Sequence, residues 1–436
     1  MLDSLHLKNA GPADEMRLDL GRRLNLVTGD NGLGKSFLLD VAWWVVTGTW
    51  AGYPVRPRSD VIKAGQPATI EYSILNGANN LSFESHFTPA KQEWTAPQHR
   101  LSHNALVIYA RVDGGFAVWD ATRNQLAREI AILGGNPSPS LPRFYHFSRT
   151  QVWEGMEGEG SRMLCNGLIR DWVSWQLAND WRFDALKKVL RVMSEAGDTL
   201  EPGSRPTRLS IDDARDYPTL RTNYGHEVPL VLASAAIRRI AALAYLLVWT
   251  WSEHRTLAEQ LATDPARNVL FLVDEVESHL HPRWQRTVVP SLLEVVKTLA
   301  PDASAQLLIS THAPLVLASV ETQFNAESDA WFDIDLNRTE RPHRVVLRKR
   351  PFVRRGEVGN WLTSDAFDLE EPRSLESERA VKEALALARK GKVSAEELLR
   401  VDDLLRASLS DVDRFWLRWS EFKSARQKPA KRGTRK

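Results

Sequence analysis

A chain of 436 residues, 43% of them hydrophobic and 26% charged, is long enough for two or three compact units of ordinary globular composition. The net charge of +2 excludes a molecule that is attracted as a whole to nucleic acid, although local basic patches remain open. The one cysteine, Cys165, excludes internal disulfides and suits a reducing compartment, so we expect a cytoplasmic protein. No signal peptide is visible, and the most apolar stretch, Ile240–Trp251, is too short to span a bilayer, so no membrane partner is expected.

The first elements in the chain are short strand-like runs that lead into a glycine-rich loop. The loop fits the pattern G-x-x-x-x-G-K-[ST], and it lies between an apolar run ending at Thr28 and a helical pattern that continues to about Thr49. Its residues are Gly29, Asp30, Asn31, Gly32, Leu33, Gly34, Lys35 and Ser36. Backbone N–H groups of such a loop surround the phosphates of a nucleotide. Lys35 would add positive charge and Ser36 would bind Mg²⁺, which predicts a site for a nucleoside triphosphate and Mg²⁺; a glycine turn that binds nothing is the alternative.

The next part of the chain, 62–120, contains strand-like runs separated by turn signals, and we expect an antiparallel subdomain inserted after the first helix. A helical region then covers about 161–196, a Pro- and Arg-rich linker covers 201–218, and a long helix begins near Ser234. The predicted domains are 1–150 (first part of the ATPase core, with the phosphate loop), 151–228 (helical subdomain), 229–350 (second part of the core), 351–425 (helical extension) and 426–436 (disordered basic tail).

Two further strands carry candidate catalytic residues. Residues 269–273 are apolar, as in a central parallel strand covered on both faces, and they are followed by Asp274 and Glu275. Asp274 would hold the metal ion and Glu275 would activate the attacking water as general base. A second apolar run, 307–309, leads to His312, which would contact the γ-phosphate. Each of these signals alone has a simpler explanation: acids often end strands, and a single histidine can cap a helix or pack in the core.

The ordered series of phosphate loop, acidic strand and histidine strand resembles the ABC-type ATPase heads of the RecF, SMC and overcoming-lysogenization-defect (OLD) group. The segment 274–282, DEVESHLHP, is similar to the DExExHLHP form of OLD-like ATPases, and ASAAIRR at 233–239 is similar to the signature motif. The resemblance implies an α/β phosphate-loop NTPase fold of ABC type, with an antiparallel β subdomain, an inserted helical subdomain and a small helical extension. It also implies a Q-loop at Gln151 and a homodimer that encloses two ATP molecules, with Ser234 reaching the γ-phosphate of the other protomer. Ala236 departs from the family because glycine is usual there.

The C-terminal part indicates what kind of partner the ATPase has. The resemblance to OLD nucleases ends before their metal-binding domain, since no acidic cluster follows His312. The C-terminal segments resemble ATPases of bacterial anti-phage systems, including the Septu type. The resemblance implies that the ATPase acts with a separate effector nuclease. Basic residues gather between 341 and 355, either to follow a phosphate backbone or to protect an edge strand. They are Arg341, Arg344, Arg348, Lys349, Arg350, Arg354 and Arg355. Trp416 and Trp419 would pack a helix or stack on bases.

The sequence therefore predicts an ATP-hydrolysing switch that works with an effector nuclease or with nucleic acid. A slow or non-hydrolysing scaffold that restrains a toxic nuclease is one alternative, which Ala236 favours. A DNA-repair ATPase of the RecF kind is another, and a transport ATPase is the least favoured class because of the 274–282 segment and the long C-terminal extension.

Overall fold

The computed structural model describes residues 1–427 apart from 78, 98–104, 133–143, 196, 198, 340, 342, 368 and 391. The chain divides into two compact units, Met1–Trp361 and Leu362–Lys436. The predicted tail, 426–436, lies outside the described residues from position 428 onward. In the described part of the chain, no helix combines the length and the apolar composition needed to cross a membrane.

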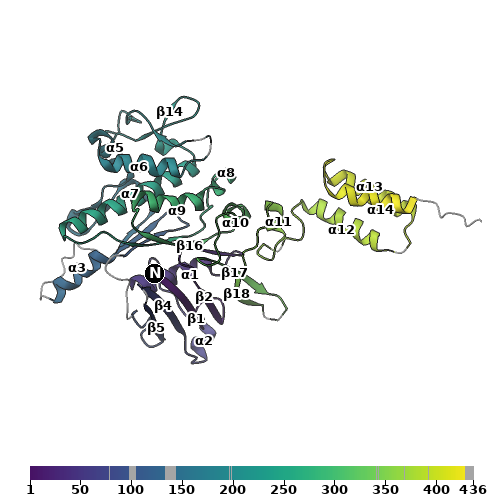
Figure 1. The fold of residues 1–436 in the computed structure, drawn as a ribbon, viewed down its shortest axis with the longest axis horizontal. Helices are drawn as coiled ribbons and strands as arrows, with labels where there is room; N and C mark the ends of the chain where they lie inside the picture. The colour runs from purple at the N-terminus through teal and green to yellow at the C-terminus, as the bar shows by residue number, and fades with distance from the viewer. Residues whose placement is uncertain are drawn as a thin grey trace, which may run out of the picture. The chain divides into compact units, whose positions relative to one another are not determined.

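The first unit is built on an eight-stranded sheet (Figure 1) with the order β18-β17-β3-β16-β15-β7-β8-β9. Its strands are β3 (Leu24–Gly29), β7 (Ala105–Ala110), β8 (Phe116–Asp120), β9 (Tyr145–Phe147), β15 (Asn268–Val273), β16 (Ser304–Ser310), β17 (Asp329–Asn337) and β18 (Arg344–Arg350). The five from β17 to β7 run parallel, whereas β18, β8 and β9 are joined by antiparallel pairings. The carboxyl ends of the five parallel strands therefore meet at one edge, where α/β sheets bind ligands.

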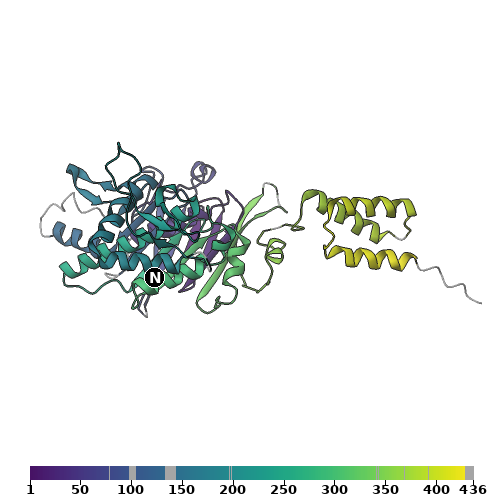
Figure 2. The same ribbon diagram turned by 90° about the horizontal axis from the view of Figure 1, so that it is seen from above.

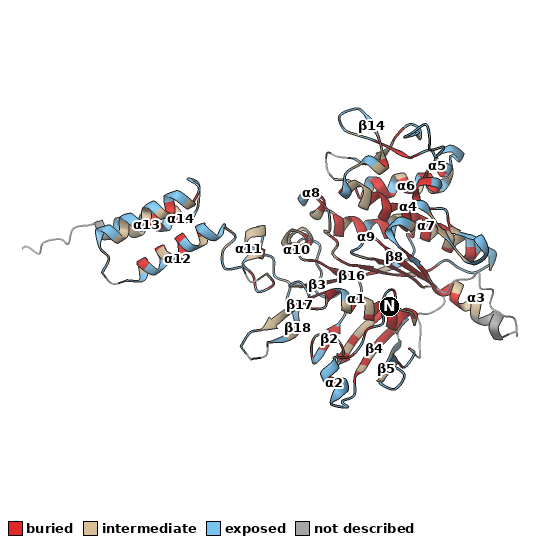
Figure 3. Ribbon diagram, turned by 180° about the vertical axis from the view of Figure 1, so that it is seen from behind, coloured by how far each residue is buried: buried red, intermediate tan, exposed pale blue. Residues whose placement is uncertain are grey.

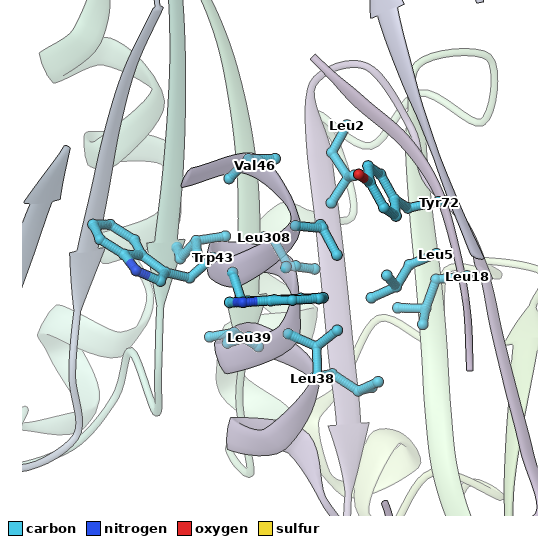
Figure 4. Close-up of a cluster of buried hydrophobic side chains, with 14 of the residues drawn as sticks. Leu2, Leu5, Leu18, Leu38, Leu39, Trp43, Val46, Tyr72 and Leu308 are labelled. Atoms are coloured by element: carbon cyan, nitrogen blue, oxygen red, sulfur yellow. The ribbon is translucent and has the colours of Figure 1, made fainter. Parts of the chain in front are cut away.

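A second, antiparallel sheet lies on one face of the main sheet, with the order β2-β1-β4-β5-β6. Its strands are β1 (Leu2–Lys8), β2 (Glu15–Asp19), β4 (Thr69–Asn76), β5 (Asn79–Thr88) and β6 (Glu93–Trp94), and the short helix α2 (Ser59–Lys63) precedes β4. Helix α1 (Lys35–Thr47) packs between the two sheets, and Trp43 on this helix is fully buried against side chains from both (Figure 4). This shared core fixes the start of α1, and hence the phosphate loop, against the sheet.

The predicted antiparallel subdomain at 62–120 is only partly right. The runs at 68–75 and 81–87 form β4 and β5 of the antiparallel sheet, but the runs at 106–112 and 115–119 form β7 and β8 of the main sheet. All six residues of β7 are buried, as expected for a strand covered on both faces, and this burial favours its parallel pairing with β15.

Helices cover the opposite face of the main sheet, and their buried positions face inward (Figure 3). They are α3 (Ala121–Ile132), α4 (Arg149–Glu154), α5 (Leu168–Ala178), α6 (Trp181–Val192), α7 (Ala235–Gln260), α8 (Pro282–Gln285), α9 (Val288–Leu299), α10 (Pro314–Val320) and α11 (Val358–Leu362). The long helix α7 begins at the cap Ser234, whose Oγ accepts the Ile237 N–H at 3.3 Å. Residues 240–250 are buried without exception, so the apolar stretch is a core helix, as predicted.

Two details of this helical layer differ from the sequence prediction. The predicted linker at 201–218 begins with a short strand, and that strand belongs to a three-stranded sheet of β12 (Glu201–Pro202), β13 (Thr219–Arg221) and β14 (Glu227–Pro229). The predicted helix at 282–299 breaks between α8 and α9, since residues 286 and 287 belong to neither. A hairpin of β10 (Met156–Glu157) and β11 (Met163–Cys165) and two single turns, η1 (Glu159–Ser161) and η2 (Leu230–Leu232), complete the layer.

The second unit contains α12 (Leu375–Arg389), α13 (Ala395–Ser408) and α14 (Phe415–Gln427), which are drawn in yellow-green to yellow in Figure 2. Ser394 and Glu397 form the predicted capping box at the start of α13. Trp419 is 2% exposed and its Nε1 donates to Asp402 at 2.7 Å, while Trp416 Nε1 donates to the Ser410 carbonyl at 2.8 Å. Both tryptophans therefore serve helix packing rather than base stacking.

Candidate functional site

The predicted phosphate loop joins β3 to α1 and depends on glycine at three positions. Gly29, Gly32 and Gly34 have φ angles of 139°, 78° and 106°, which side chains rarely tolerate. A Cβ atom at Gly29 would lie 2.1 Å from the Ile334 carbonyl oxygen, and one at Gly34 would lie 2.7 Å from Pro12 Cγ. The loop therefore keeps its backbone close to two neighbouring segments, while Gly32 at the tip faces open space.

Lys35 is the charged side chain that the loop encloses. Its Nζ donates to the carbonyl oxygens of Gly29 at 2.7 Å and Asp30 at 2.8 Å. Burial lowers the pKa of Lys35, and the nearby carboxylates, Glu275 first, oppose that shift. The next residue, Ser36, is exposed in the first turn of α1. The arrangement gives one buried cation and one exposed serine at a helix N-terminus, as phosphate and Mg²⁺ binding require.

The acidic pair at the end of β15 is held by the end of β16. Asp274 is 2% exposed, and its Oδ1 accepts the Ser310 hydroxyl at 2.6 Å. The same Ser310 Oγ accepts the backbone N–H of Glu275 at 2.8 Å. Glu275 has a φ of 46°, a conformation that is strained for a non-glycine residue and that this hydrogen bond helps to maintain. One buried hydroxyl therefore contacts both acids, the predicted metal ligand Asp274 and the predicted general base Glu275.

His312 lies beside the predicted general base. Its Nε2 is 3.1 Å from Glu275 Oε1, and the two side chains are 28% and 34% exposed, so both are accessible to a ligand. The backbone of the histidine segment is clamped by Glu277, whose carboxylate accepts the His312 N–H and, at 2.8 Å, the Thr311 hydroxyl. The loop, acidic and histidine residues predicted from the sequence thus lie at the ends of three adjacent strands.

Besides Ser310 and Glu277, two further residues of this site were not predicted as site residues. Arg239, in the first turns of α7, donates to the carbonyl oxygens of Asp274 at 3.5 Å and Glu275 at 3.4 Å, and burial lowers its pKa. Asp40 follows Ser36 by one helical turn, and burial raises its pKa to about 6. In the sequence, an arginine near the start of one helix and an acid one turn into another helix are ordinary features. Only the fold brings them close to Asp274.

The structure engages the two remaining predicted residues in helix caps. Gln151 completes a capping box at the start of α4, where its Oε1 accepts the Ser148 N–H at 2.9 Å. The strand that precedes this helix, β9, is at the sheet edge, separated from β15 by β7 and β8. Ser234 caps α7 and is exposed. His281 likewise caps α8 by accepting the Arg283 N–H, which is a structural role for this histidine.

The predicted basic segment includes the edge strand β18, and several of its charges are already paired. Arg350 lies 3.3 Å from Asp333 and Arg344 lies 3.5 Å from Asp14. Lys349 Nζ donates to the Asp19 carbonyl at 3.0 Å. These contacts attach the edge strand to its own unit and agree with the charge-protected edge that the sequence offered as an alternative.

Comparison with known proteins gives partial matches. Residues 139–318 match the family described as "AAA domain, putative AbiEii toxin, Type IV TA system". The chain is 25% identical over 100 residues to "Retron Ec83 probable ATPase" of Escherichia coli, a match over 23% of this chain and 15% of that protein. It is 39% identical over 54 residues to "Retron Vc95 probable ATPase" of Vibrio cholerae serotype O1 biovar El Tor, over 12% of this chain and 9% of that protein. The matches therefore span less than a sixth of either relative.

Among solved structures, the SMC head domain from Thermotoga maritima is similar with a TM-score of 0.38 at 14% identity, over 80% of this chain and 99% of that one. The recombination mediator RecF, in a structure titled as its ATPrS complex, is similar with a TM-score of 0.34 at 13% identity, over 76% of this chain and 95% of that one.

The protein has the α/β fold of a phosphate-loop ATPase domain, as the sheet, the loop geometry and the AAA-domain match show together. The two retron proteins that match parts of the chain are each named a probable ATPase.

Proposed function

We propose that the chain is an ATP-binding and ATP-hydrolysing ABC-type head that acts as a nucleotide-dependent switch. The observation that carries this proposal is the convergence of Lys35, the Asp274–Glu275 pair and His312 at the carboxyl ends of three neighbouring parallel strands. A glycine-rich turn without a ligand would not need a buried lysine or a general-base candidate hydrogen-bonded to a histidine.

Each residue then has a role that follows from its position. Lys35 and the loop N–H groups bind the phosphates, while Ser36 and Asp274 would hold Mg²⁺, which supplies charge neutralisation on the phosphates. Glu275 accepts the proton of the attacking water. His312, 3.1 Å from that carboxylate, orients it and contacts the γ-phosphate.

The proposed switch is a head-to-tail dimer that encloses two ATP molecules. Ser234 supports this arrangement because it is exposed at the N-cap of α7 and so is available to a second copy. Ala236, where glycine is usual in the ABC group, is 8% exposed and packs into its own helix layer. Because of this methyl group, we expect the contact between the signature motif of one protomer and the ATP of the other to be the weakest part of the ATPase cycle.

The proposed setting is bacterial anti-phage defence with a separate effector nuclease. The similarity to two retron ATPases and to a family described as a putative toxin of a type IV TA system supports an ATPase that works beside a partner protein.

Two other functions remain as candidates, each with one observation in its favour. Ala236 favours a slow or non-hydrolysing ATP-gated scaffold that restrains a toxic nuclease. The basic residues around β18, including Arg348 on the strand, favour a RecF-like DNA-repair ATPase that binds duplex DNA.

Phosphate release by the purified full chain separates these functions. The proposed ATPase gives steady turnover with ATP and Mg²⁺ in the absence of DNA, and chelation of the metal abolishes it. ATP binding without turnover would replace the proposal by the scaffold. Turnover only with duplex DNA, together with duplex affinity in the absence of any partner, would replace it by the repair function.

A further inference from the structure

A cavity of about 290 Å³ lies beside the acidic loop that follows β15. Its walls come from the loop after β7, from α4, from the start of α7 and from residues 276–280. Phe116, Trp153 and Leu243 form part of an apolar lining. All eight residues of the phosphate loop are described by the structure, and none of them lines this cavity. The cavity therefore adjoins the proposed nucleotide site, with which it shares Arg239, but the phosphate loop is not part of its wall.

The cavity wall carries more positive charge than negative. Its charged groups are Arg111, Asp113, Arg149, Arg238, Arg239 and His279. Arg111 and Asp113 lie 3.6 Å apart and offset each other. Arg149, Arg238 and Arg239 have no ion-pair partner in the part of the chain that the structure describes, although carboxylates such as Glu277 lie near Arg239.

Arg238 places an unsatisfied hydrogen-bond donor on this wall. Its Nε is buried and has no hydrogen-bond partner among the described residues. Among the described residues, Arg239 donates only to carbonyl oxygens, those of Val112, Asp274 and Glu275. A buried guanidinium donor without an acceptor is unfavourable, so an anion that enters the cavity would be bound by charge-assisted hydrogen bonds.

The size and lining of the cavity restrict the ligand. A volume near 290 Å³ corresponds to about ten water molecules, which is more than a buried water site needs and near the lower limit of small-molecule pockets. Trp153 offers an aromatic face next to the arginines.

We propose that this cavity binds a small organic anion, in which one phosphate, sulfonate or carboxylate group is attached to an aromatic or aliphatic body. The anionic group is bound by Arg238, with Arg149 and Arg239 nearby, and the body packs on Trp153 and Leu243. Because Arg239 also contacts the backbone of Asp274 and Glu275, occupancy would change the position of the acidic loop and the rate of turnover; this regulatory consequence rests on the proposed ATPase function, whereas binding itself does not.

The test uses the fluorescent aromatic sulfonate 8-anilinonaphthalene-1-sulfonate as the probe and the full chain without nucleotide. We expect saturable binding of one probe molecule per chain. Arg238→Gln, which removes the charge, weakens binding about tenfold or more. Ala242→Leu, which adds bulk at the lining without touching a charge, also weakens it. Circular dichroism verifies that each variant is folded, and either variant alone is sufficient for the test.

Two matched controls decide where the probe binds. Arg255→Gln removes an arginine from the same helix, α7, at a position outside the cavity, and Lys35→Ala removes the cation of the phosphate loop. Both should bind the probe as the unmodified chain does. Equal loss in Arg255→Gln, loss in Lys35→Ala, or full binding by either folded cavity variant, Arg238→Gln or Ala242→Leu, would each overturn the proposal. Since no nucleotide is present, a chain that fails to hydrolyse ATP would still give the expected result.

Discussion

Replacing Ser310 by alanine should impair catalysis although Ser310 touches neither nucleotide nor metal in the proposed site. The change removes the 2.6 Å hydrogen bond to the Asp274 carboxylate and the acceptor for the Glu275 N–H at 2.8 Å. A hydrogen bond to a charged group contributes about 1.5–3 kcal/mol. If that bond is expressed only in the transition state, its loss lowers kcat about 10- to 150-fold.

The assay is phosphate release as a function of ATP and Mg²⁺ concentration. We expect Ser310→Ala to lower kcat and to require more Mg²⁺, because Asp274 loses the group that orients it, while the KM for ATP changes little. Ser291→Ala is the matched control, since Ser291 is also buried and donates one hydrogen bond, at 2.8 Å, to the Val192 carbonyl away from the site. Unchanged kcat and Mg²⁺ dependence in Ser310→Ala would refute the reasoning.

Three more predictions concern the same strand edge. Lys35→Ala should weaken ATP binding at least about 100-fold, measured by calorimetry, because the only buried cation of the loop is lost; near-normal affinity would contradict its role. Glu277→Ala should lower turnover about 10- to 100-fold by releasing the His312 segment, and turnover equal to that of the unmodified chain would show that this clamp is dispensable. Asp40→Asn should raise the thermal midpoint at pH 8 and have little effect near pH 4. Burial raises the pKa of Asp40 from 3.8 to about 6, so the folded state loses stability as the pH rises from the first value through the second. The same shift of the thermal midpoint at both pH values would contradict the assignment.

The nucleotide constellation could be predicted because each part is a contiguous pattern. The glycine spacing at 29–36, the apolar run before Asp274 and the run before His312 each encode a strand end together with its functional side chain. The position of these strand ends at one edge then follows from parallel pairing, which the buried, two-sided hydrophobic pattern of β15 and β16 indicates.

The rest of the site depends on contacts between distant residues, which local patterns do not encode. Ser310 and Glu277 look like ordinary members of a strand end and of a loop, and only the pairing of β15 with β16 brings them to Asp274 and His312. For the same reason the sequence does not reveal that β7 belongs to the main sheet: the turn signals that follow it identify a strand but not its partner.

The central claim, that Glu275 is the general base of an ATP-enclosing dimer, is tested most directly by Glu275→Gln. The variant keeps the size of the side chain but cannot accept the proton of water. We predict that ATP binding persists, that turnover falls about 100-fold or more, and that light scattering with ATP and Mg²⁺ shows twice the 49.3 kDa mass of the chain. Turnover by Glu275→Gln at the rate of the unmodified chain would contradict the account.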